Sequence, residues 1–453
     1  MNLLANGENF GKSKGPVITI NPKLINSEPQ EIVKVSKTRV MFCGTYPIGQ
    51  SNGYSRVVYY VSKYLGIKED IELTIYGFQN FKNTASNGRT DIPPNVIIHD
   101  AYATEEPKRS GFGEKEVATY LKAHPQDIVI IFNDMVITTS LVRDIVLNLS
   151  TEERSKFKLI SYMDQVYPYQ KTEFINVLNE YFDAVIAFTP YWESVVKKLG
   201  LKKEMPTYHF PHGFDDKLYF PMPKLLARTY FNIPQDAFVI LNLNRNQPRK
   251  RWDHTMMAFA NVVERHYKLK DSTRPIRLMI GTAIKGFWNL MEIYDNELKK
   301  RNIPIDIGRE YISTIENPQQ LTDRSINIIY NICDIGINTC EGEGFGLCQF
   351  EHLALGCPQI VANIGGFKEF INDTNSTLIE PKWNYYVDNV RDGIGGFAEV
   401  SNPNDFADAI WDYYTRPEKV TEHGKNGRNE IIQHYSWETV VNMLYKIIKT
   451  TRI

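Results

Sequence analysis

Residues 333–356 read CDIGINTCEGEGFGLCQFEHLALG and combine a short apolar run, a glycine-rich turn and a helical pattern. CDIGINT (333–339) is apolar and bounded by turn residues, which predicts a buried strand. LCQFEHLALG (347–356) ends at Gly356 and predicts a helix whose buried stripe contains Leu347, Phe350 and Ala354. A strand, turn and helix in this order are typical of a parallel sheet, with the turn at its carboxyl edge.

The same alternation runs through most of the chain. It begins with an apolar run at 38–44 and a helical pattern at 54–66, pauses at the proline-rich segment 206–224, and then resumes. Apolar strands alternating with helices predict an α/β fold of parallel sheets covered on both faces. The pause predicts a linker between two doubly wound domains with a cleft between them. Residues 381–397 are expected to be a loop insertion.

Length and composition agree with two folded domains. The chain has 453 residues, of which 42% are hydrophobic and 23% charged, as in ordinary globular proteins. We expect an N-terminal tail or arm at 1–36, a first Rossmann-like domain at 37–212, a second at 213–430, and a terminal helix at 431–453.

The charge and cysteine content exclude several classes of function. The formal net charge is −1, so no global field favours nucleic acid. No apolar run approaches the ~20 residues of a membrane span, and the start lacks the apolar core of a signal peptide. The five cysteines include no C-x-x-C pair. We expect buried thiols and a cytoplasmic protein, in preference to a zinc site.

The glycine-rich turn carries the candidate chemistry. Glycines at 342, 344 and 346 allow close approach of a ligand, and a helix N-terminus at this place favours a phosphate. The spacing does not fit the dinucleotide fingerprint, which argues against a dehydrogenase. Taken alone, Glu343 and Glu351 are compatible with two solvated acids or with a glycosidase pair.

A longer pattern makes the segment recognisable. The run E-G-F-G-L-x-x-x-E (343–351), then A-L-G-C-P, and later Gly365, Gly366 and Glu369 as G-G-x-x-E, resembles the donor site of glycosyltransferase family 4. The resemblance covers about residues 38 to 450. It implies the GT-B fold, a retaining transferase, an acceptor-binding first domain and a donor-binding second domain.

The resemblance also implies residue roles in the second domain. Glu343 would lie near the sugar or diphosphate of a nucleotide sugar, and Glu351 would accept hydrogen bonds from its ribose. The backbone N–H groups of Phe345, Gly346 and Leu347, next to Gly344, would hold the phosphates.

Two cations complete the donor site implied by the resemblance. Arg245 and Lys250, in LNLNRNQPRKRW, match the family's arginine and lysine and would neutralise the leaving diphosphate. Arg249 and Arg251 are expected to be merely solvated.

The first domain is less clearly marked. Gly49 and Gly53 resemble the family's glycine loop, which approaches phosphate or acceptor, although a plain strand–helix turn explains them equally well. In SYMDQVYPY, Asp164 stands where many family members carry a histidine, so it is the candidate catalytic group of this domain. Asn133 and Asp134 are weaker candidates.

The remaining resemblances concern the linker and the end of the chain. HFPHGFDD (209–216) contains His209, His212, Asp215 and Asp216. It resembles the family's segment entering the second domain, and we expect packing, in preference to a metal site. YSWETVVNMLYKII resembles the family's terminal helix, which crosses back to the first domain.

These observations predict a glycosyltransferase that uses a nucleoside-diphosphate sugar, with a UDP- or GDP-sugar as the expected donor and no required metal or cofactor. The acceptor is a hydroxyl of a glycan, a lipid-linked or a small molecule, and membrane association is at most peripheral. Two alternatives stay open: a pseudoenzyme that binds the nucleotide sugar, motivated by Asp164, and a GT-B sugar-nucleotide epimerase.

Overall fold

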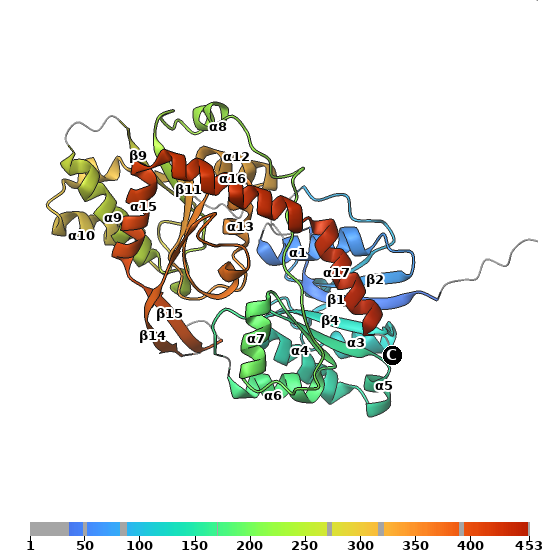
Figure 1. Ribbon diagram of the computed structural model, residues 1–453. Coiled ribbons are helices and arrows are strands. Elements are labelled where there is room, and N and C mark those ends of the chain that lie inside the picture. Colours follow the sequence, from blue (N-terminus) through green and yellow to red (C-terminus); the bar gives the residue numbers. More distant parts are fainter. Residues whose placement is uncertain are drawn as a thin grey trace, which may run out of the picture. The chain divides into compact units, whose positions relative to one another are not determined.

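Two parallel sheets organise the chain, as the alternation of apolar strands and helices predicts (Figure 1). The computed structural model describes residues 36–48, 52–81, 88–169, 171–269, 274–315, 321–388 and 394–451. Almost all of the expected tail at 1–36 lies outside these residues. The predicted α/β class with two doubly wound domains is confirmed, whereas the exact domain boundaries stay predictions.

The first domain is built on a seven-stranded sheet of order β3-β2-β1-β4-β5-β6-β7, parallel throughout. Helices join its consecutive strands except β2 and β3, between which the described residues form no helix, and each crossover brings the next strand in parallel to its neighbours. The elements are β1 (Thr38–Thr45), α1 (Gly53–Leu65), β2 (Ile71–Phe78), β3 (Ile97–Asp100), α2 (Ala101–Thr104), α3 (Val117–Ala123), β4 (Ile128–Asn133), α4 (Met135–Asn148), α5 (Thr151–Ser155), β5 (Lys158–Met163), α6 (Thr172–Tyr181), β6 (Ala184–Ala187), α7 (Pro190–Lys198) and β7 (Thr207–His209).

The second domain is built on a six-stranded parallel sheet of order β10-β9-β8-β11-β12-β13. Its elements are α8 (Lys224–Tyr230), β8 (Phe238–Asn242), η2 (Pro248–Lys250), α9 (Trp252–Lys268), β9 (Ile276–Ile280), α10 (Leu290–Lys300), α11 (Ile305–Arg309), β10 (Ile312–Thr314), α12 (Asp323–Ile332), β11 (Ile335–Asn338), α13 (Leu347–Ala354), β12 (Gln359–Ala362), η4 (Gly365–Glu369), β13 (Thr377–Ile379), α15 (Pro403–Thr415) and α16 (Pro417–His434).

One expectation about a connecting segment is wrong, and another segment is shorter than expected. Residues 381–397 are not a loop: β14 (Pro381–Val387) pairs antiparallel with β15 (Gly396–Ser401) as a separate hairpin. The expected linker at 206–224 begins with β7, which pairs with β6 at the edge of the first sheet. The hydrophobic pattern of the sequence identifies neither the pairing of β14 with β15 nor that of β7 with β6.

The last helix, α17 (Trp437–Thr450), packs on α1 of the first domain (Figure 1). The rings of Trp437 and Tyr60 stack with centroids 4.5 Å apart. Lys68 donates to Asn442 at 2.7 Å, and the Tyr445 hydroxyl to Asp70 at 2.9 Å. The chain therefore enters the first domain twice, before and after it builds the second.

The two domains share a core within one compact unit, Lys37–Ile453. A single cluster of buried apolar side chains includes Val58 of α1, Phe210 of the linker, and both Ile240 and Phe350 of the second domain. A separate cluster lies on the first domain alone and includes Leu141 of α4. This continuity holds the carboxyl edges of the two sheets close to each other, and the candidate site lies there.

Candidate active site

A cavity of about 550 Å³ lies where the carboxyl ends of strands from both sheets come together. This is the expected place for a ligand in an open α/β sheet. The first domain contributes residues that follow β1, β4, β5 and β6, and the second contributes residues that follow β8 and β11. The predicted site residues in its wall are Gly53, Asn133, Asp134, Asp164, Arg245, Lys250, Glu343, Gly344, Phe345, Gly346 and Leu347.

The glycine-rich turn is packed directly against the first domain. A Cβ on Gly344 would lie 2.2 Å from Oδ1 of Asp164, so a side chain fits there only if the Asp164 carboxyl group moves. Gly346 has φ +89° at the start of α13, a conformation that disfavours any side chain. No side chain caps α13 among the described residues, so its first N–H groups point to the cavity end without such a partner. The turn can thus receive a phosphate.

Glu343 is held in the cavity wall by cations and amides. Its carboxylate contacts the Lys250 ammonium group and accepts a hydrogen bond from Asn338 at 3.4 Å. Burial would raise the pKa of Glu343, but Lys250 and Arg249 outweigh it and keep the pKa below its usual range. Glu343 is therefore a carboxylate at neutral pH, next to the cavity.

Arg245 and Arg249 add two further positive charges, and the expectation for Arg249 is wrong. Arg249 is not solvated: it donates to the carbonyl oxygen of Gly342 at 2.9 Å and lies 3.8 Å from Glu343. Arg245 faces the open cavity. Desolvation by the surrounding protein and the positive charge of Arg249 both lower the pKa of Arg245. Three cations, Arg245, Arg249 and Lys250, thus meet in one wall, an arrangement suited to a diphosphate.

Arg251 is not solvated either. It adopts a left-handed conformation with φ +46° just before α9. Its guanidinium pairs with Asp253 at 2.8 Å and with Glu341 at 3.1 Å. Through Glu341 it connects the start of α9 to the glycine-rich turn, and it does not line the cavity described above.

Asp164 faces this cationic wall from the end of β5. It accepts a hydrogen bond from the Tyr54 hydroxyl of α1. Burial raises the pKa of Asp164 to about 6, although Tyr54 and Arg249 partly oppose the shift. Asp134, a weaker candidate, accepts hydrogen bonds from the N–H groups of Val136 and Ile137 as the cap of α4. Asp164 is therefore a buried acid of the first domain that faces the cations of the second.

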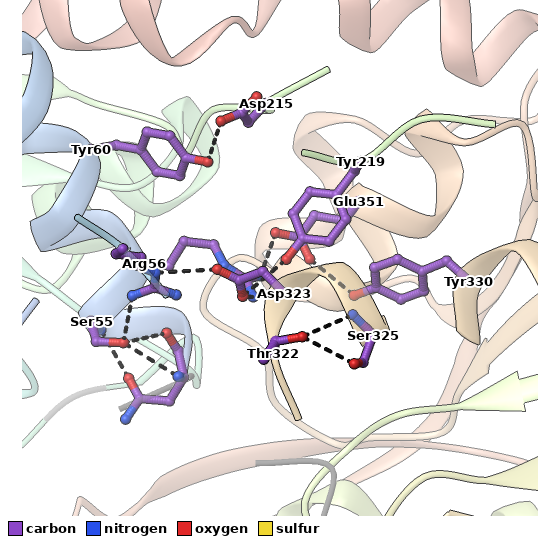
Figure 2. A network of polar contacts seen from close by, with 12 residues as sticks. Ser55, Arg56, Tyr60, Asp215, Tyr219, Thr322, Asp323, Ser325, Tyr330 and Glu351 are labelled. Carbon is purple, nitrogen blue, oxygen red and sulfur yellow. Dashed lines mark hydrogen bonds and ion pairs between the residues drawn. The ribbon is translucent and has the colours of Figure 1, made fainter. Parts of the chain in front are cut away.

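Glu351 lies in a buried ionic cluster and is not among the residues in the cavity wall (Figure 2). Its carboxylate pairs with Arg56 and accepts a hydrogen bond from Tyr330 at 2.9 Å. Burial raises the pKa of Glu351, and Arg56 only partly opposes this. Arg56 and Tyr330 both line the cavity, so they stand between it and Glu351.

The linker histidines do not form a metal site in the part of the chain that the structure describes. His212 packs between the rings of Phe188 and Phe345, with centroids 4.8 and 4.5 Å away. Burial lowers the pKa of His212 to about 3, so it is neutral. All five cysteines are free thiols, and four are buried while Cys348 is partly exposed.

The sequence missed three residues of this site: Arg56, Arg249 and Tyr54. Arg56 and Tyr54 belong to the helical pattern at 54–66, where nothing distinguishes them from surface residues. Only the meeting of the two sheets places them at the cavity. Gly49 lies outside the described residues, and a Cβ on Gly53 would be 3.7 Å from Leu347, in ordinary contact.

Several solved structures have the same two-domain architecture. Sucrose-phosphate synthase from Thermosynechococcus elongatus matches 91% of this chain and 99% of its own, with TM-score 0.67 and 15% identity. Anabaena HepE, solved with UDP and glucose, matches 91% of this chain and 100% of its own, with TM-score 0.65 and 15% identity. At this identity the likeness shows the fold.

Sequence relatives are named as glycosyltransferases. D-inositol 3-phosphate glycosyltransferase of Saccharomonospora viridis is 25% identical over 239 residues, which are 52% of this chain and 48% of the relative. The enzyme of the same name from Kribbella flavida is 26% identical over 187 residues, 41% of each chain. The matched part thus spans about half the length of these relatives or less.

Among the described residues, none of the helices has the length and apolar character of a membrane span. Residues 226–430 match the model of Glycosyl transferases group 1, and the chain has the two-domain fold of the GT-B structures it resembles.

Proposed function

We propose that the protein moves a sugar from a nucleoside-diphosphate sugar to an acceptor hydroxyl, with retention of anomeric configuration. One observation carries the proposal: three cations, the open end of a helix and two carboxylates from opposite domains converge on one cavity. Retention rests on the resemblance to family 4, and a UDP- or GDP-sugar is the expected donor. The structure of HepE with UDP and glucose supports a nucleotide site in this fold.

The second domain would hold the donor. The diphosphate accepts hydrogen bonds from the N–H groups at the start of α13 and charge-assisted ones from Arg245, Arg249 and Lys250. Each such donor, fixed before the reaction, contributes up to ~3 kcal/mol to transition-state stabilisation. Glu343, kept ionised by Lys250, accepts hydrogen bonds from sugar hydroxyls.

The reaction then balances without a protein nucleophile. The bond from the anomeric carbon to the phosphate oxygen breaks, and the electron pair leaves with the diphosphate. The acceptor oxygen attacks the same face and passes its proton to the departing phosphate oxygen. Positive charge on the anomeric carbon is opposed by the carboxylate of Asp164 from the first domain. Metal independence stays a prediction.

The acceptor would enter from the first domain and can be a glycan, a lipid-linked or a small molecule. The curated relatives are named for D-inositol 3-phosphate, which makes an inositol phosphate one acceptor to test. With both substrates bound, the facing surfaces of the two domains would exclude water and orient the hydroxyl.

One observation favours a second candidate. Asp164 occupies the position of the family's histidine, and a protein that binds donor without turnover is compatible with that exchange. Donor consumption separates the candidates: transfer needs an acceptor, an epimerase forms an isomer without one, and a pseudoenzyme consumes nothing.

Thermal unfolding with UDP, GDP, ADP and their sugar conjugates tests the donor site first. A nucleotide at about 100 times its Kd stabilises the folded state by ~2.7 kcal/mol, which shifts the Tm by a few degrees. We expect a shift with one base only. If no nucleotide shifts the Tm, the cavity is not a donor site and the proposal fails.

A further inference from the structure

Four charged side chains meet in the buried cluster beside the cavity, and the two domains contribute opposite signs. The cations belong to the first domain: Arg56 on α1 and Arg89 before β3. The anions belong to the second: Asp323 at the start of α12 and Glu351 on α13. All four are at least nine-tenths buried. The cluster is therefore neutral only while the two domains are in contact.

Arg56 is the centre of this cluster, as Figure 2 shows. It pairs with Asp323 at 2.7 Å and with the carboxylate of Glu351. Arg89 pairs with Asp323 at 3.2 Å and donates a hydrogen bond to the Ser55 hydroxyl at 3.1 Å. Within the described contacts, Arg56 alone joins the first domain to Glu351 by an ion pair.

We propose that Arg56 is an interdomain latch that covers Glu351 and must leave it before a nucleotide ribose can bind there. Arg56 and Tyr330 line the cavity and hold the two oxygens of Glu351, which is itself only 2% exposed. Ribose hydroxyls can reach this carboxylate only after the guanidinium has moved. The inference rests on the proposed function, because the ribose belongs to the proposed donor.

The energetics suit a latch that opens. Removing two charges from water costs nearly as much as their mutual attraction returns, so a buried ion pair adds little net stability. When the domains separate, water hydrates the charged groups of both domains. If the domains shift while they stay in contact, these charges remain buried without a partner. The cluster therefore specifies one closed arrangement without making it hard to leave.

The geometry also gives the direction of movement. Arg56 lies on α1, which belongs to the first sheet, whereas Glu351 and Tyr330 lie on α13 and α12 of the second. When the domains separate, Arg56 leaves with the first domain, and Glu351 stays beside the donor cavity. Nucleotide binding and domain opening are thus coupled through one carboxylate.

The first test measures nucleotide affinity by calorimetry with the full chain. The probes are the nucleoside diphosphate found in the thermal screen and its 2′,3′-dideoxy form. If the latch covers Glu351 nine-tenths of the time, Arg56→Met should tighten binding of the ribonucleotide about tenfold and leave the dideoxy form unchanged. Lys63→Met is the matched control, since Lys63 lies on the same helix but pairs with Asp91 inside the first domain at 2.6 Å.

A second variant guards against misfolding. Arg56→Met leaves two anions with one cation, whereas the double variant Arg56→Met/Asp323→Asn restores a neutral cluster of Arg89 and Glu351. We expect the double variant to unfold cooperatively and to show the same gain in ribonucleotide affinity. Weaker or unchanged binding, or an equal gain with the dideoxy form, overturns the proposal.

Small-angle X-ray scattering tests the latch without a nucleotide, which separates it from the proposed function. Loss of the latch should increase the radius of gyration of both Arg56 variants but not of Lys63→Met. An unchanged radius overturns the latch. If no variant binds any nucleoside diphosphate, the donor proposal fails, and the ribose part of this inference fails with it.

Discussion

The Lys250 ammonium group pairs with the Glu343 carboxylate inside the cavity wall, and the two side chains are only 9% and 10% exposed, respectively. Each therefore sets the charge environment of the other, and neither acts alone. We expect Lys250→Met to lower kcat about 100- to 1,000-fold, as loss of a fixed donor to a developing anion does.

The same pair should show strong coupling. In a cycle with Lys250→Met, Glu343→Gln and the double variant, we expect the losses in kcat to be non-additive by roughly 0.5–3 kcal/mol. Lys197→Met, which breaks an exposed pair with Glu193 on α7, is the control and should leave kcat unchanged. Additive losses would mean that the two groups serve separate steps.

Substitutions of the two glutamates, Glu343 in the turn and Glu351 in the helix, should affect different constants. Glu351→Ala should mainly raise the Kd for the nucleotide, because Glu351 is the proposed ribose partner. Glu343→Ala should mainly lower kcat, because Glu343 is proposed to act on the reacting sugar. Kd by calorimetry and kcat by donor consumption distinguish them, and unaltered kinetics in both variants would refute the site.

The raised pKa of Asp164 predicts an acidic limb in the pH profile. If its carboxylate opposes positive charge on the sugar, kcat/KM should fall as the pH drops through about 6, where Asp164 becomes protonated. Asp164→Asn should lower activity and remove this limb. A limb that persists in the variant belongs to another group.

The same shift affects stability with a defined sign. A carboxyl group whose pKa rises on folding, here from 3.8 to about 6, favours the folded state most below pH 3.8. This contribution is lost as the pH rises through about 6. Asp164→Asn should therefore gain more Tm relative to the parent protein at pH 8 than at pH 5.

Gly344 offers a steric test of the contact between domains. Gly344→Ala places a Cβ 2.2 Å from the Asp164 carboxylate, which is held by Tyr54, so we expect lost activity. Gly53→Ala is the matched control: its Cβ meets only Leu347, at 3.7 Å, and should be tolerated. Activity and Tm of both variants check this, and an active Gly344→Ala variant would show that Asp164 can move freely.

The packing of Trp437 should contribute much of the free energy that holds α17 on the first domain. It is 2% exposed and stacks on Tyr60, so Trp437→Ala should cost ~3–5 kcal/mol of unfolding free energy. Trp383→Ala is the control, because that ring is 51% exposed on β14. Urea unfolding of both variants measures the difference, and equal costs would contradict the assignment.

The sequence predicted what repeats along the chain and missed what depends on distant contacts. The apolar run 333–339 and the glycine turn predicted strand, turn and helix correctly, because local pattern and tertiary burial agree there. The hairpin of β14 and β15 escaped because its aromatic residues are partly exposed and do not alternate with polar ones. Arg56 escaped because only the approach of the two sheets brings it to Asp323 and Glu351, and Arg249 escaped because its partner Glu343 is 94 residues away in the sequence.

The return of α17 to α1 has a consequence for synthesis in the cell. Leu65 and Trp437, at the ends of the contacting helices, are separated by roughly 370 residues, which take ~20–70 s to translate. During that time α1 lacks its final cover, so a nascent first domain exposes the face that Trp437 later fills. The completed second domain must therefore emerge before the first becomes a finished unit, and chaperones have most to protect in that interval.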